Sequence, residues 1–114
     1  MAEECLFCKI AQGVEPGVKV WEDAEFIAIE NKFPKAPIHV LVMPKLHVDK
    51  SDTIHGSIPG YWDRFMDAIA QVIKQYGLDR TGYKLVNNGA GYNHFSHEHM
   101  HVLGGSKEEP AGET

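Results

Sequence analysis

The histidines of this chain are concentrated in one short stretch. Four of the seven lie within eight residues, and the sequence there reads His94-Phe-Ser-His97-Glu-His99-Met-His101. In an extended strand, residues two apart point to the same side and lie about 7 Å from each other. The alternation therefore predicts that His97, His99 and His101 form one row of imidazoles. Such a row can bind phosphate, attack phosphorus or ligate a metal ion.

A second interpretation of the same stretch is a zinc protease, because residues 97–101 also satisfy the pattern H-E-x-x-H. That pattern requires a helix, since only on a helix do residues four apart share a face. Glycines close the stretch on both sides and no capping signal precedes it, which favours a strand. Residues 107–114 also offer only acidic side chains as a further zinc ligand. A chance histidine-rich strand is disfavoured by the strict period of two.

The two cysteines are close together, in Cys5-Leu-Phe-Cys8. A structural disulfide is disfavoured in a reducing compartment, so the pair predicts a zinc site, a redox dithiol or buried inert thiols. A thioredoxin-type dithiol follows a strand, whereas Cys5 precedes every strand signal. A zinc site with two cysteines and two histidines would need His47 and one of the clustered histidines. Zinc is the favoured interpretation, and inert thiols stay open.

Hydrophobic periodicity predicts the strands that position these side chains. A short helix over residues 5–12 comes first and ends at Gly13. Four strands are predicted before the histidine strand, over residues 18–22, 26–29, 39–43 and 83–86. The chain between Pro44 and Gly60 is predicted to be a loop in which His55 is exposed to solvent.

One long helix is predicted from about Pro59 to Tyr76. Its apolar residues recur at spacings of three and four, which gives a single stripe: Trp62, Phe65, Met66, Ile69, Val72, Ile73 and Tyr76. Pro59 suits the first turn and Gly77 suits the C-terminal end. Strands joined by short turns, with one helix inserted, indicate an antiparallel α+β domain.

Composition limits the function classes. The chain has 114 residues, 43% of them hydrophobic, and a formal net charge of −5 without a basic cluster. Binding to a nucleic-acid backbone depends on many Lys and Arg contacts and is therefore disfavoured. The sequence starts without a leader-like segment and contains no apolar run long enough to cross a membrane, so we expect a soluble cytoplasmic protein. A small phosphate ligand remains compatible with this charge.

With these residues placed, the chain resembles the histidine triad family of nucleotide hydrolases and transferases. The resemblance covers about nine-tenths of the chain. It rests on Cys5-Leu-Phe-Cys-Lys-Ile, Phe26-Ile-Ala-Ile, Pro34-Lys-Ala-Pro-Ile-His39, Leu41-Val-Met-Pro-Lys-Leu-His47, Asn87-Asn-Gly89 and His97-Glu-His-Met-His-Val-Leu103. It implies a five-stranded antiparallel sheet with a short N-terminal helix and one long helix over residues 1–105. Residues 106–114 are expected to be a flexible tail, and two chains are expected to form a dimer with a ten-stranded sheet.

The resemblance also implies an activity. His99 is similar to the family nucleophile that attacks the α-phosphorus of a nucleotide and becomes a transient nucleotidyl-histidine. Its central place in the row supports this role, because neighbours on both sides can orient the ring and hold phosphoryl oxygens. His101 and His39 would support the same site. The expected substrates are purine nucleotides, either a nucleoside 5′-phosphoramidate or a dinucleoside polyphosphate, and a nucleotide-binding scaffold with little turnover is the alternative.

The nucleotide contacts implied by the resemblance are Asn31, Asn87, Asn93 and His94, together with His99 and His101. Three positions depart from the family pattern. Asn31 stands where the family generally has an acid for the ribose hydroxyls, so either an amide replaces the carboxylate or the neighbouring Glu30 takes its place. Asn93 and His94 replace residues near the leaving group. Glu98 occupies a hydrophobic position, where a buried acid needs a partner, so it is expected either to face solvent or to pair with an opposed base such as Lys84.

The Cys-x-x-Cys pair resembles that of the zinc-bearing branch of the family. In that branch the cysteines join the histidine after Pro-Lys-x and the first histidine of the triad. The implied ligands of a structural zinc ion are Cys5, Cys8, His47 and His97. A zinc-bound His97 would be fixed in orientation, which leaves His99 as the nucleophile.

Overall fold

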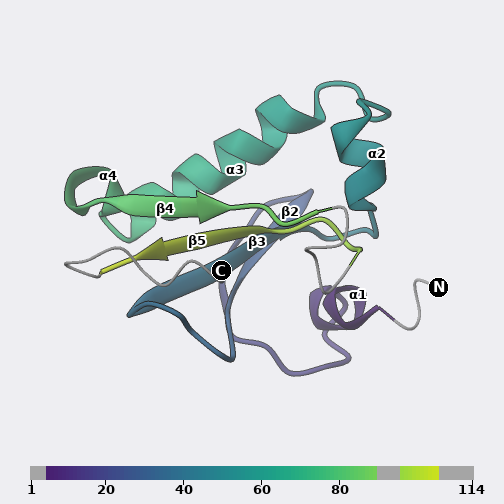
Figure 1. Cartoon of the computed structure of the whole chain (residues 1–114). Helices are drawn as coiled ribbons and strands as arrows, with labels where there is room; N and C mark the ends of the chain where they lie inside the picture. The colour runs from purple at the N-terminus through teal and green to yellow at the C-terminus, as the bar shows by residue number, and fades with distance from the viewer. Residues whose placement is uncertain (1–4, 90–95, 106–114) are drawn as a thin grey trace.

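The computed structural model describes residues 5–89 and 96–105, and its sheet contains every strand that the sequence predicts. The strands are β1 (Lys19–Glu22), β2 (Phe26–Glu30), β3 (Ile38–Pro44), β4 (Tyr83–Val86) and β5 (Met100–Gly104). Their order in the sheet is β1-β2-β3-β5-β4, and every neighbouring pair is antiparallel. The predicted α+β class with a five-stranded antiparallel sheet is confirmed (Figure 1).

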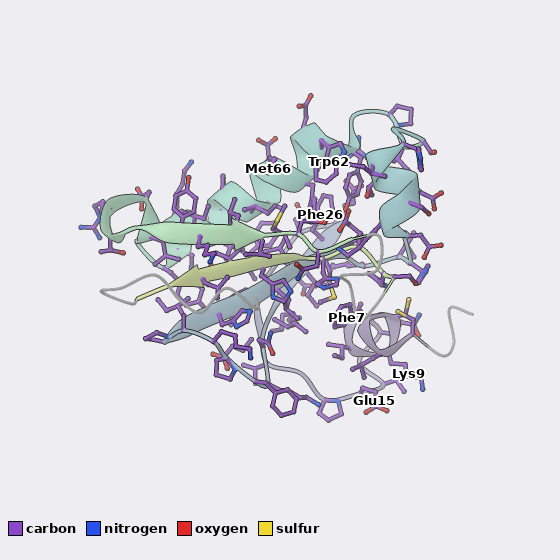
Figure 2. All side chains as sticks on the ribbon, viewed as in Figure 1. Phe7, Lys9, Glu15, Phe26, Trp62 and Met66 are labelled. Carbon is purple, nitrogen blue, oxygen red and sulfur yellow. The ribbon has the colours of Figure 1, made fainter. Side chains whose placement is uncertain are left out.

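The two faces of the sheet carry different helices. The long helix α3 (Tyr61–Gln75) lies across one face, and the short helix α1 (Leu6–Ala11) lies on the other (Figure 1). Phe65, Ile69 and Val72 of α3 are buried with Phe26 and Val102 of the sheet in the larger apolar core. On the opposite face, α1 packs over a smaller cluster (Figure 2), made of Phe7, Ile10, Ile27, Ile29, Leu41 and Met43.

The helix α3 agrees closely with its prediction because its periodic stripe is long. Gly60 precedes it with a left-handed backbone, and Gly77 follows it with a φ of 69°. Both positions suit glycine, which adopts positive φ without a steric penalty. Within residues 5–89 and 96–105, no helix combines the length and apolarity that crossing a membrane would need.

Two short helices fall where the sequence predicts none. The helix α2 (Lys50–Ile54) lies inside the predicted loop between Pro44 and Gly60, and α4 (Leu78–Thr81) follows α3. The predicted loop is therefore wrong over five residues. His55 follows α2 directly and is exposed, as expected. The consequence for the site is that α2 turns Lys50 inward, where its side chain is buried.

Candidate active site and metal cluster

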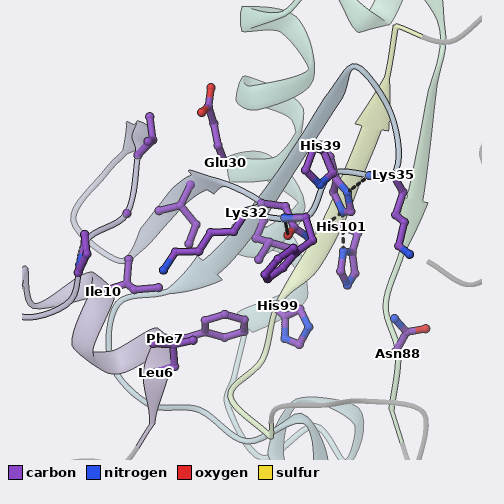
Figure 3. Close-up of a pocket in the computed structure, with 18 residues that line it drawn as sticks. Leu6, Phe7, Ile10, Glu30, Lys32, Lys35, His39, Asn88, His99 and His101 are labelled. Atoms are coloured by element: carbon purple, nitrogen blue, oxygen red, sulfur yellow. Dashed lines mark hydrogen bonds between the residues drawn. The ribbon is translucent and has the colours of Figure 1, made fainter.

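A cavity of about 870 Å³ opens between α1, the loop after β2 and the histidine strand (Figure 3). Its apolar part is formed by Leu6, Phe7 and Ile10 of α1 with Ile29 and Leu41 of the sheet. Its polar part holds three histidines and four polar residues at the end of β2 and in the loop that follows: His39, His99, His101, Glu30, Asn31, Lys32 and Lys35. An apolar surface beside a polar row suits a ligand with a flat ring at one end and a charged group at the other.

The three alternating histidines lie on the face that α1 covers. The ring of Phe7 makes edge contacts with His97 and His99, at centroid distances of 5.8 and 4.9 Å. The rings of His99 and His101 are 5.3 Å apart. The segment is extended and the strand begins at Met100, so the predicted row is present and the helical arrangement of a zinc protease is not.

The ring of His99 has a defined tautomer. Its Nδ1 lies 2.8 Å from the carbonyl oxygen of His97 and donates a hydrogen bond to it. In a neutral imidazole the other nitrogen then carries a lone pair. Burial lowers the pKa of His99 to about 4, although the hydrogen bond to His97 acts in the opposite direction. At neutral pH, His99 therefore lines the cavity as an uncharged ring with an unprotonated Nε2.

A chain of hydrogen bonds likewise orients His101. The backbone N–H of Lys35 donates to Nδ1 of His39, at 3.0 Å. In a neutral ring the proton of His39 is then on Nε2, which lies 2.9 Å from Nδ1 of His101. Burial, followed by the charge of Lys35, lowers the pKa of His39 and favours this neutral form. A neutral His101 that accepts at Nδ1 carries its own proton on Nε2.

The asparagines predicted to contact nucleotide are placed differently from one another. Asn31 lines the cavity, its Oδ1 accepts the N–H of Phe33, and its Nδ2 lies 3.2 Å from Nε2 of His39. The amide of Asn87 instead donates to Glu98 and to the carbonyl oxygen of His99, and the neighbouring Asn88 lines the cavity. Asn93 and His94 lie outside the described residues.

Glu98 is buried, with an exposed fraction of 1%, and is fully paired. Its Oε1 accepts hydrogen bonds from Nζ of Lys50 at 2.8 Å and from Nδ2 of Asn87 at 2.9 Å, and its Oε2 accepts from the hydroxyl of Thr53. Burial raises the pKa of Glu98, but these hydrogen bonds outweigh burial and hold the pKa below its ordinary value. Glu98 is therefore a buried carboxylate that is compensated by Lys50.

The pairing with Lys84 that the sequence suggested is wrong. In the β4–β5 register, Lys84 lies opposite Leu103, five residues along the chain from Glu98. Five residues of strand span about 17 Å, which is beyond the reach of a lysine side chain. Sequence reasoning missed Lys50 because the residue becomes an inward-facing partner only through α2. The one available signal was that Glu98 needed a cation.

The four residues predicted to bind metal converge on one point. The ligating atoms of Cys5, Cys8, His47 and His97 all lie within 4.8 Å of one another. Three sulfur–nitrogen distances are 3.3 to 3.4 Å. Ligand distances typical of tetrahedral zinc give sulfur–nitrogen separations of about 3.6 Å. The four side chains are thus already spaced as the corners of such a site.

The outer nitrogens of the two histidines support the same arrangement. Nε2 of His97 donates to the carbonyl oxygen of Pro44 at 2.8 Å, and Nε2 of His47 donates to Asp49 at 2.7 Å. Both Nδ1 atoms then present lone pairs to the cysteine sulfurs, which is the usual environment of a metal-binding histidine.

Both cysteines are free. Burial and the neighbouring Cys5 raise the pKa of Cys8 to about 11, so the thiol keeps its proton unless a cation binds beside it.

Comparison with known proteins agrees with this geometry. The HIT domain family matches residues 12–108. A histidine triad protein from Clostridium difficile has 36% sequence identity and a TM-score of 0.84, over 95% of this chain and 96% of that chain. Purine nucleoside phosphoramidase from Escherichia coli is 31% identical over 107 residues, which are 92% of this chain and 90% of that protein. A zinc-bound histidine triad family protein from Mycobacterium smegmatis has 25% identity and a TM-score of 0.75, over 94% of this chain and 78% of that chain.

The sheet, the helix on each face and the row of three histidines define a histidine triad protein. The chain belongs to the HIT domain family, a family of hydrolases and nucleotide-binding proteins. Its cluster of Cys5, Cys8, His47 and His97 is compatible with the zinc-binding branch of that family. The resemblance stated from the sequence is therefore confirmed.

Proposed function

We propose that this protein is a nucleotide hydrolase that cleaves at the α-phosphate of a nucleoside 5′-phosphoramidate or a dinucleoside polyphosphate. The observation that carries the proposal is the fixed tautomer of His99. Its Nδ1–H is bound to the carbonyl oxygen of His97, and the ring lines a cavity large enough for a nucleotide. The similarity to a purine nucleoside phosphoramidase supports this reaction class.

The first step forms a covalent intermediate on His99. Nε2 of His99 attacks the α-phosphorus and forms a phosphorus–nitrogen bond. The bond from phosphorus to the leaving nitrogen or oxygen breaks, and its electron pair stays with the leaving group. Nε2–H of His101 donates a hydrogen bond to a phosphoryl oxygen, and the leaving group takes the proton it needs from solvent water. No strong base is needed, because His99 is already neutral and unprotonated at Nε2.

The second step releases the nucleoside monophosphate. A water molecule attacks the same phosphorus, the bond to Nε2 of His99 breaks, and its electron pair returns to the ring. The proton lost by the water goes to solvent, which balances the proton taken from solvent in the first step, and Nε2–H of His101 stays hydrogen-bonded to the phosphoryl group. His39 holds His101 in the tautomer that both steps require, since its Nε2–H donates to Nδ1 of His101.

The cavity also indicates how the nucleotide would lie. A purine base suits the apolar part under Phe7 and Ile10, which places the phosphates beside His99 and His101. Asn31 and Asn88 line the same cavity and supply amide groups for the ribose or phosphates. We include Asn87, Asn93 and His94 as further nucleotide-binding candidates from the sequence. The side chains of Lys32 and Lys35 add positive charge that favours a phosphorylated ligand.

We propose that the four-residue cluster binds a structural zinc ion. Cys5 and Cys8 would bind it through sulfur, and His47 and His97 through Nδ1. When bound, zinc supplies no reaction step and cross-links α1 to the segment that leads into β5. This arrangement fixes the helix that forms the apolar part of the cavity, so metal binding and ligand binding involve the same helix.

We further propose that two chains form a homodimer with a ten-stranded sheet. β1 and β4 are the edge strands of the sheet, and Tyr83 on β4 is 53% exposed. An edge strand offers unpaired backbone groups to a second copy. Sedimentation at micromolar concentration should give the mass of two chains, and a single-chain mass would contradict the dimer.

Incubation with an adenosine phosphoramidate and with a diadenosine polyphosphate tests the activity by release of AMP. The His99→Ala variant should lose several powers of ten in rate, because loss of a covalent nucleophile removes the main pathway. His55→Ala is the matched control, since His55 is exposed and lies outside the cavity. Retention of about a tenth of the wild-type rate by His99→Ala would eliminate this mechanism. Binding of nucleotide without turnover by the wild type would instead indicate the scaffold.

A further inference from the structure

The backbone of His99 is held by side chains and not by a neighbouring strand. The β3–β5 ladder ends at Met100 and the β4–β5 ladder ends at His101. The N–H of His99 donates to Oε1 of Glu98 at 2.8 Å. The carbonyl oxygen of His99 accepts from Nζ of Lys50 at 3.1 Å and from Nδ2 of Asn87 at 3.2 Å. The residue proposed as the nucleophile therefore lies just beyond the regular sheet.

The side chains that replace the ladder form a closed network. The ammonium group of Lys50 has three protons and three acceptors, which are Glu98 Oε1, Asn87 Oδ1 and the carbonyl oxygen of His99. The carboxylate of Glu98 also accepts the hydroxyl of Thr53. Lys50, Thr53 and Glu98 are buried, with exposed fractions of 8%, 2% and 1%.

Two backbone contacts tie the same segment to the start of α2. The N–H of Lys50 donates to the carbonyl oxygen of Ser96 at 2.9 Å, and the N–H of Glu98 donates to that of Val48 at 2.7 Å. The segment from Ser96 to His99 is thus anchored on α2 through both backbone and side chains. A missing cation at position 50 would leave the carboxylate of Glu98 buried and unpaired, which proteins rarely tolerate.

We propose that Lys50, Glu98, Thr53 and Asn87 form a clamp that positions His99 for attack. Lys50 and Glu98 are its essential positioning residues. The inference rests on the proposed function, because it assigns the clamp to the nucleophile of that reaction. The clamp acts through the backbone of His99: with the N–H and the carbonyl oxygen both fixed, the bond from Nδ1 to the carbonyl oxygen of His97 determines where Nε2 points.

Two double variants separate positioning from stability. Lys50→Met/Glu98→Gln and Lys50→Met/Glu98→Leu both remove the buried charges, so neither leaves an unpaired ion. Only the glutamine variant keeps a side-chain oxygen that can accept the N–H of His99. We expect kcat of the leucine variant to lie about 10- to 100-fold below that of the glutamine variant, since small displacements of a reacting group have effects of this size. KM and zinc content should be equal in the two variants.

Equal kcat values in the two folded double variants would overturn the proposal. If the leucine variant does not fold, Asn87→Ala replaces it, because this change removes one donor to the His99 carbonyl oxygen without emptying the core. A lower kcat is expected together with a mixture of both His99 tautomers, and an unchanged kcat would again overturn the clamp.

The tautomer of His99 gives a readout that does not depend on activity. Nitrogen NMR of the zinc-loaded protein at fixed neutral pH should show the Nδ1–H form in the wild type and a mixture of both forms in the leucine variant. The pure Nδ1–H form in both proteins would overturn the clamp. Failure of the proposed function is recognised separately: His99→Ala would keep the wild-type rate, or the wild type would show no turnover, while the tautomer still changed in the leucine variant.

Discussion

The two faces of the sheet are built by different means. The α3 face is an apolar core in which Phe65, Ile69 and Val72 have exposed fractions of 0%. The α1 face has a smaller apolar cluster and carries the histidine row, the cavity and the metal cluster. Packing on the first face depends on the volume and polarity of many side chains. Geometry on the second depends on a few hydrogen bonds and ligands, so single substitutions should separate stability from activity.

The largest effect on stability is expected on the α3 face. Phe65 stacks on Phe26 at a centroid distance of 5.3 Å and is buried. Phe65→Ala should lower the free energy of unfolding by about 3–5 kcal/mol, because it leaves a cavity in a packed core. Denaturant unfolding measures the loss. The kcat of the folded fraction should stay close to that of the wild type, since Phe65 does not line the site.

Phe7→Ala is the matched change on the α1 face. Phe7 contacts the rings of His97 and His99 and lines the cavity. We expect a smaller loss of unfolding free energy than for Phe65→Ala but a higher KM and a lower kcat. If both variants lost stability and activity in the same proportion, the two faces would not be separable in this way.

Removal of metal is expected to have the next largest effect on the free energy of unfolding. If Cys5, Cys8, His47 and His97 bind zinc, the purified protein should contain about one zinc per chain. Free zinc at about 100 times its dissociation constant should add about 2.7 kcal/mol to the free energy of unfolding. Thermal unfolding with and without a chelator measures the contribution of zinc. The melting temperature of Cys5→Ser should respond only weakly to the chelator, because this variant lacks one of the four ligands. A metal-free preparation that melts unchanged would rule the zinc site out.

The smallest effect on stability is expected for two ion pairs that belong to neither face, in which Lys19 and Lys45 both contact the carboxylate of Glu22. Hydrogen bonds from Lys19 and then Lys45 lower the pKa of Glu22 to about 2. Because the folded-state pKa is lowered, the stabilisation is present above the ordinary carboxyl pKa of about 4.3 and is lost as the pH falls towards 2.

Glu22→Gln should therefore lower the melting temperature slightly at pH 6 and by much less near pH 2. Salt at about 1 M should abolish the difference, since exposed pairs are screened. Asp67→Asn is a suitable control, because Asp67 is an exposed carboxylate in the middle of α3 without an ion pair to any residue that the structure describes. The same pH dependence in both variants would contradict the assignment to these two ion pairs.

These contrasts also show what the sequence could predict. The helix α3 and the five strands were predictable because each has a long or regular hydrophobic period, and His99 and His101 because their spacing of two is itself the structural signal. The helix α2 was not predictable from periodicity. It has five residues, and tertiary contacts support it, among them the hydrogen bond from the indole N–H of Trp62 to the carbonyl oxygen of Thr53.

The partner of Glu98 was missed for the same reason. Lys50 is 48 residues away in the sequence and reaches Glu98 only because α2 forms and docks beside Ser96. A buried carboxylate in the histidine strand indicated that a cation was needed. It did not indicate which one, because that choice depends on the three-dimensional path of the chain between Pro44 and Gly60. Periodic patterns thus predicted the α3 face and the histidine row, and a non-local contact completed the site.

The central claim is that His99 becomes covalently bound to nucleotide during turnover. The most direct test is to mix the wild-type protein with adenosine 5′-phosphoramidate, quench within milliseconds and analyse the peptides by mass spectrometry. We expect an adenylyl group on His99 that forms and decays at rates consistent with kcat and is absent in His99→Ala. AMP release without an adduct on His99, or an adduct on another residue that the His99→Ala variant retains, would contradict it.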